Sequence, residues 1–84
     1  MSVHWTLNAY GKKKGQDHLQ AEWEIVAPLE AMKAIVPPRS DDPEMYASYF
    51  PLSEAQVRRL GKFALGGPVV DFDRYEYALE CCRD

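Results

Sequence analysis

Residues 2–25 read SVHWTLNAYGKKKGQDHLQAEWEI, and the two ends of this stretch share one pattern. Apolar and polar residues alternate over residues 2–10 and again over residues 19–25, which predicts two strands with one buried face each. Between them, two glycines bracket three lysines, so we expect an antiparallel hairpin around a basic loop. In such a hairpin Trp5 and Trp23 can face the same core.

Two short helices are predicted downstream of the hairpin. Apolar residues recur at helical spacing from Pro28, placed at the first helical position, to Val36, and the prolines at 37–38 end this helix. The second helix has Ser53 as its N-cap, with Gln56 three residues later as the partner in a capping box. Its apolar side extends through residue 64, and we expect the Gly-Gly-Pro sequence that follows to stop it.

The C-terminal region returns to a period of two. From Val69 onward the pattern favours a strand, most clearly over Tyr75–Cys81, although a helix over Tyr75–Cys82 is an alternative because Glu, Ala and Leu favour helix. The predicted order is therefore ββααβ in a single domain, residues 1–84. The fold class is α+β, a small antiparallel sheet made of the N-terminal hairpin and the C-terminal strand, with both helices packed on one face. Residues 39–51 form a long irregular connection, and ordered loops of that length are often functional.

The charge balance argues against several classes of partner. Ten basic and thirteen acidic residues give a net charge of −3, which does not favour a sequence-independent binder of nucleic acid. Residues 40–54 carry four acidic residues and no basic one. No apolar run approaches the roughly 20 residues of a membrane span, and the N-terminus opens into the alternating pattern rather than a signal peptide. We therefore expect a cytoplasmic protein that does not contact a membrane.

Catalytic and metal-binding patterns are not recognisable in the sequence. His4 and His18 have no cysteine or carboxylate at a familiar ligand spacing, and residues 41–44 lack the ligand spacing and the glycine of a calcium loop. No arrangement of nucleophile and base is evident, and 84 residues leave little room for a pocket that excludes water. We expect no enzyme activity, cofactor or metal.

An acidic and aromatic surface is the strongest functional candidate. Carboxylates steer the approach of a basic protein, and tyrosines anchor it at a small cost in side-chain entropy. The candidate partner-binding residues are Asp41, Asp42, Glu44, Tyr46, Tyr49, Asp71, Asp73 and Glu76. The alternative is structural: the aromatic residues cap the core, and the carboxylates along the last strand deter edge-to-edge aggregation.

Two motifs carry a resemblance to a known class of protein. Residues 42–46, Asp-Pro-Glu-Met-Tyr, and residues 71–77, Asp-Phe-Asp-Arg-Tyr-Glu-Tyr, flank the predicted helix that follows Pro51. Together they resemble the small bacterial immunity proteins of contact-dependent and other polymorphic toxin systems, over about residues 41–80. The resemblance implies a cytosolic, acidic, cofactor-free domain that binds a cognate toxin domain, with basic nucleases as a common target.

Two other classes of function stay open at this point. A small nucleic-acid-binding module would use the loop Lys12–Lys14 together with Arg58, Arg59 and Lys62. A self-associating structural module, including a homodimer, would use an exposed strand edge.

Overall fold

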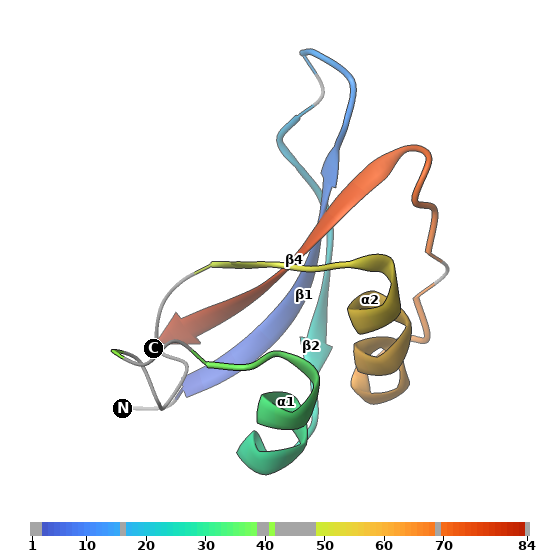
Figure 1. Ribbon diagram of the computed structural model, residues 1–84. Helices are drawn as coiled ribbons and strands as arrows, with labels where there is room; N and C mark the ends of the chain where they lie inside the picture. Colours follow the sequence, from blue (N-terminus) through green and yellow to red (C-terminus); the bar gives the residue numbers. More distant parts are fainter. Residues whose placement is uncertain (1–2, 16, 39–40, 42–48, 69, 84) are drawn as a thin grey trace.

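The computed structural model describes residues 3–15, 17–38, 41, 49–68 and 70–83 (Figure 1). Its described strands form one four-stranded antiparallel sheet in the order β2-β1-β4-β3. The bounds of the strands are β1 Val3–Gly11, β2 Leu19–Ile25, β3 Phe50–Pro51 and β4 Tyr75–Arg83. The hairpin of β1 and β2 is confirmed, and the C-terminal segment is the expected strand rather than the alternative helix.

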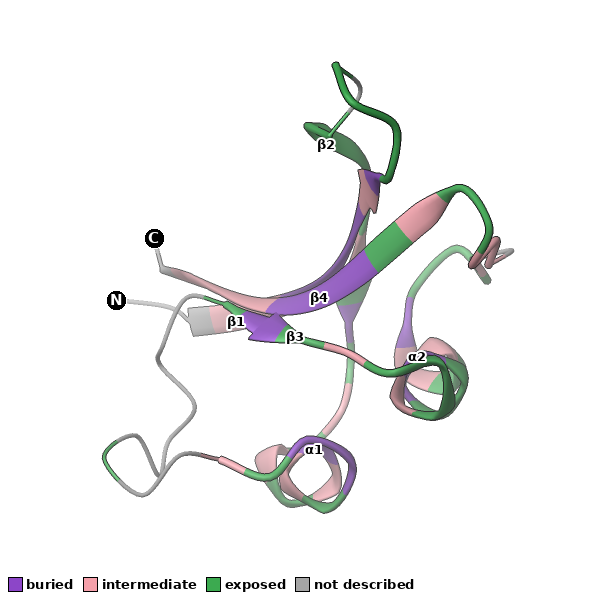
Figure 2. Cartoon of the chain, turned by 45° about the horizontal axis from the view of Figure 1, so that its top comes forward, coloured by how far each residue is buried: buried purple, intermediate pink, exposed green. Residues whose placement is uncertain are grey.

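The helices lie together on one face of this sheet (Figure 2), which confirms the α+β class. Their bounds are α1 Leu29–Ile35, α2 Glu54–Leu60 and a 3-10 turn, η1, Gly61–Phe63. The capping box at the start of α2 is present: the Gln56 backbone N–H donates to Ser53 Oγ, and the Ser53 N–H donates to Gln56 Oε1. The Gln56 side chain also donates to the carbonyl of Ile35, which ties the start of α2 to the end of α1.

Four details differ from the sequence prediction. The last strand begins at Tyr75 and not at Val69, because residues 72–74 form a turn. Pro28 is the N-cap residue of α1, with extended backbone, and not its first helical residue. The second helix tightens into η1 at Gly61, three residues before the predicted helix would end. Phe50 and Pro51, expected in the irregular connection, pair with β4 as a short edge strand.

The core lies between the sheet and the helices. Leu7 and Leu79 face each other across β1 and β4, and both side chains are fully buried. From the helical layer, Met32, Val57 and Leu60 complete this cluster, and Trp5 and Trp23 pack against it as expected. The side chains of the β strands therefore alternate between this core and the opposite face of the sheet.

Part of the outer edge of β2 is covered by the chain that follows η1. The Leu65 N–H donates to the carbonyl of Glu24 at 2.8 Å, and the Val26 N–H donates to the carbonyl of Phe63 at 2.8 Å. Gly66, in the left-handed region at φ 93°, lies against the indole of Trp23. Within the described part of the chain, no helix is long and apolar enough to cross a membrane.

Candidate functional site: the open face of the sheet

The face of the sheet opposite the helices carries no described helix, and we call it the open face (Figure 2). The strand register sets its composition. Thr6 lies between Glu24 on β2 and Glu80 on β4, and the next row outward places Asn8 between Glu22 and Ala78. A polar row on β1 is thus flanked by carboxylates from the strands on both sides.

The charge of the open face is negative. Glu22, Glu24 and Glu76 are exposed, and Glu80 is half-buried. Among the strand residues whose side chains the structure describes, none on this face is lysine or arginine. Four carboxylates on one side of a small sheet create a field that attracts cationic groups.

A hydrogen-bonded cluster occupies the middle of the open face. The Asn8 side-chain amide donates to Glu80 Oε2 at 2.5 Å, and the Tyr10 hydroxyl donates to the same oxygen. Burial, followed by the hydrogen bond with Glu80, raises the pKa of Tyr10 above its ordinary value. One carboxylate therefore holds two side chains of β1 in fixed positions.

Asn8 also presents an unsatisfied acceptor. Its side chain is only 3 % exposed, and its Oδ1 atom has no hydrogen-bond partner among the described residues. Leaving a buried acceptor unpaired costs about 1–3 kcal/mol, so such groups in native proteins call for an explanation. Because this atom is itself buried, a partner that binds the open face does not reach it in this conformation.

Tyr10 and Tyr49 form an aromatic cover over the centre of the open face. Their ring centroids are 6.3 Å apart at an interplanar angle of 60°, an edge-to-face contact. Tyr10 lies on β1 and Tyr49 immediately precedes β3, and β4 runs between these two strands. The rings therefore meet across β4, in which Ala78 is fully buried.

The predicted partner-binding residues are divided between several places. Asp42, Glu44 and Tyr46 lie outside the described residues, and Asp41 is exposed. Glu76 is on the open face, and it shares a shallow depression with Tyr49.

Two other predicted residues lie in the turn before β4. Asp71 Oδ1 accepts hydrogen bonds from the backbone N–H groups of Asp73 and Arg74, and the Asp71 N–H donates to the hydroxyl of Tyr77. Asp71 thus has a structural role in shaping this turn. Asp73 is exposed at the tip of the sheet, apart from the row of Thr6 and Asn8.

Sequence reasoning missed most of the open face. The residues that it did not single out are Asn8, Tyr10, Glu22 and Glu24, and it considered Glu80 only as one of the carboxylates along the last strand. The sequence did contain a signal for them. Alternate residues of a strand point to opposite faces, so residues that alternate with the core residues must lie on the face away from the core. What the alternation does not give is the strand order, which places β1 between two acidic strands.

The described residues offer no obvious place for a metal ion. Within residues 3–15, 17–38, 41, 49–68 and 70–83, no group of three or more His, Cys, Asp or Glu side chains is arranged to hold one.

Comparison with known proteins gives one match. A family model described as "Domain of unknown function (DUF7683)" matches residues 4–80, which includes the helices and all but the ends of β1 and β4. No curated protein and no solved structure matches the chain.

Proposed function

We propose that this chain, which belongs to the DUF7683 family of domains of unknown function, is a small cytoplasmic immunity protein. Its role is to bind a cognate toxin domain and neutralise it, without catalysing a reaction. The open face is the surface that contacts the toxin. The observation that carries this proposal is the gathering of four carboxylates and two tyrosines on one face that no described helix covers.

The carboxylates of the open face support the proposal that the partner is basic. Complementary charge steers two proteins together and rejects partners of the wrong sign. A toxin that acts on nucleic acid needs a basic groove for the phosphate backbone, and a row of carboxylates can occupy that groove in place of phosphates. A nuclease is therefore the toxin class that best fits Glu22, Glu24, Glu76 and Glu80.

The centre of the open face supports a specific contact as well as attraction at long range. Glu80 is held by Asn8 and Tyr10, so its carboxylate meets a partner in one orientation. An arginine of the toxin presents several N–H donors in one plane and can pair with this carboxylate in a fixed geometry.

The size of the protein is sufficient for this role. A typical specific interface takes about 800 Å² from each partner. The protein exposes 5383 Å², so such an interface uses about 15 % of its surface. One face of the sheet with its aromatic rim can provide that area.

The test is direct binding between the purified protein and the product of the neighbouring gene, where an immunity protein's toxin is expected. Titration calorimetry at low and at moderate salt should give a one-to-one complex that weakens as salt rises. The double variant Glu22→Gln, Glu24→Gln should lower the affinity by about tenfold or more at low salt. The matched control is Asp17→Asn, Glu30→Gln, which changes the net charge equally at exposed positions outside the open face and should bind as the wild type does.

Three results would contradict the proposal. One is equal loss of affinity in both double variants, which would remove the open face from the interface. Another is a complex that leaves the toxic activity of the partner unchanged. The third is retention of nucleic acid through Lys12–Lys14, or of a second copy of the chain through a strand edge, in place of a toxin.

A further inference from the structure

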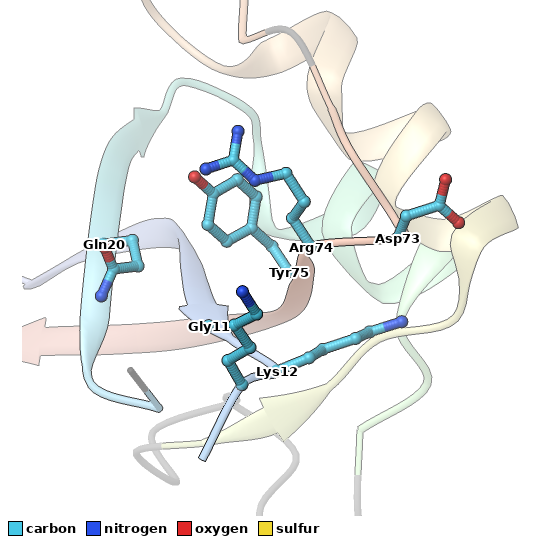
Figure 3. A pocket seen from close by; sticks show the side chains of 7 residues that line it. Gly11, Lys12, Gln20, Asp73, Arg74 and Tyr75 are labelled. Carbon is cyan, nitrogen blue, oxygen red and sulfur yellow. The ribbon is translucent and has the colours of Figure 1, made fainter. Parts of the chain in front are cut away.

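A second surface lies at the tip of the sheet (Figure 3), next to the depression of Tyr49 and Glu76, with which it shares Lys12 and Tyr75. Here β1 ends and β4 begins, with Gly11 paired to Tyr75. The hollow between them has a volume of about 200 Å³, several times the roughly 30 Å³ that a water molecule takes in the liquid. It is lined by Gly11, Lys12, Lys13, Gln20, Asp73, Arg74 and Tyr75.

The walls of this hollow are held in place before any ligand arrives. The Lys12 N–H donates to the carbonyl of Arg74 at 3.0 Å, which continues the β1–β4 pairing beyond the strands. The Lys12 ammonium donates to the carbonyl of Phe72, so the basic loop is fastened to the turn before β4. A cavity fixed by its own backbone is preorganised for binding.

The charge of the hollow opposes that of the protein. Three cationic side chains and one carboxylate line it, in a chain with a net charge of −3. Among the described residues, Lys13 and Arg74 form no ion pair. The Arg74 guanidinium is instead placed over the ring of Tyr75, 5.4 Å from its centroid, as Figure 3 shows.

We propose that this hollow binds a small phosphate-type anion, either inorganic phosphate or the phosphate of a nucleoside monophosphate. The guanidinium of Arg74 supplies paired N–H donors that match two oxygens of one phosphate, and the Lys13 ammonium adds a point charge. The Arg74 guanidinium already lies over the ring of Tyr75, so a base can stack on the outer side of that guanidinium plane. A long nucleic acid is disfavoured, because the acidic side chains of Asp73 and Glu76 flank the hollow.

The experiment is a titration of the full chain, labelled with ¹⁵N, followed by NMR at low ionic strength. The probes are inorganic phosphate, adenosine monophosphate and a single-stranded oligonucleotide, with sodium chloride at matched ionic strength as the blank. We expect saturable shifts of the amides of Gly11, Gln20 and Tyr75 with phosphate. Tighter binding of adenosine monophosphate than of phosphate would assign the site to nucleotides, and equal binding would assign it to the free anion.

Variants in the same region separate a built site from general attraction to lysines. Arg74→Gln and Lys13→Gln should each weaken phosphate binding by about fivefold or more, since each removes charge-assisted hydrogen bonds. Lys14→Gln removes the same charge from the same loop but does not line the hollow, so it should bind phosphate as the wild type does.

The proposal is overturned by any of three results. If Lys14→Gln weakens phosphate binding as much as Lys13→Gln does, the anion is attracted to the lysines in general and not bound in the hollow. Shifts that follow ionic strength alone would show that no anion is held. Binding of the oligonucleotide without binding of phosphate or adenosine monophosphate would show a surface for nucleic acid instead. None of these outcomes depends on the toxin proposal, because no partner protein is present.

Discussion

The individual residues at the centre of the open face owe their roles to partners far away in the sequence. Asn8 and Glu80 are 72 positions apart, and nothing local to either residue indicates that they share a hydrogen bond. Ser53 and Gln56 show the opposite case, because both halves of their capping box lie within one helical turn. Residue roles could be predicted where the partner is close in sequence and could not be predicted where the fold supplies it.

Tyr10 provides a test at this scale. Because burial and the hydrogen bond with Glu80 both raise its pKa, Tyr10 should ionise above the ordinary tyrosine value of 10.0. The difference between the alkaline absorbance titrations of the wild type and of Tyr10→Phe isolates this group from the other tyrosines. In Glu80→Gln the pKa of Tyr10 should fall toward 10 without reaching it, since burial is still present.

The same shift sets a pH window for stability. A group whose pKa is higher in the folded state stabilises the fold fully below its unfolded pKa, and this contribution disappears as the pH rises through the folded value. The wild type should therefore lose stability above about pH 10 more steeply than Tyr10→Phe in urea unfolding. Identical slopes for the two proteins would contradict the shift.

At the scale of elements, the sequence pattern was sufficient to predict a helix or strand where that element is long or clearly capped. The alternation over residues 19–25 coincides with β2, and the capping box marks the start of α2. The short strand β3 could not be predicted, because Phe50 and Pro51 become a strand only when β4 offers them an edge. Proline lacks a backbone donor, and an edge strand is one of the few places in a sheet where it is tolerated.

Removing the cap of α2 should have a measurable cost. Ser53→Ala deletes the acceptor for the Gln56 N–H and should lower the free energy of unfolding by about 1 kcal/mol, measured by urea denaturation. Ser53→Asp retains an acceptor and places a negative charge at the start of the helix, so it should keep most of the stability. Equal losses in both variants would mean that the cap does not stabilise α2.

The whole molecule separates its functions by face. One face of the sheet carries the helices and the core, the other carries the carboxylates, and the tip carries the basic hollow. The fold class followed from the sequence, since helices with one apolar side and a half-buried sheet must cover each other. The site did not follow, because the arrangement of charges on the open face depends on the strand order β2-β1-β4-β3.

The position of the core is tested by two leucines. Leu7 is fully buried, and Leu7→Ala should lower the free energy of unfolding by about 2–5 kcal/mol. Leu65 is 54 % exposed, and Leu65→Ala should change the free energy of unfolding by no more than about 0.5 kcal/mol. Chemical denaturation of both variants checks this contrast. Similar losses of unfolding free energy at the two positions would mean that the core is not where the structure places it.

The pairing of β1 with β4 has a consequence for how the chain reaches its folded state. These two strands form the middle of the sheet, yet Val3 pairs with Arg83 across almost the full sequence. Contacts between residues this far apart slow folding, because the chain must close a long loop before they form. On the ribosome, the hairpin of β1 and β2 emerges well before residues 75–83, and an isolated hairpin is only marginally stable in water. Trp5, Leu7 and Trp23 therefore remain without the rest of their core until residues 75–83 have been synthesised.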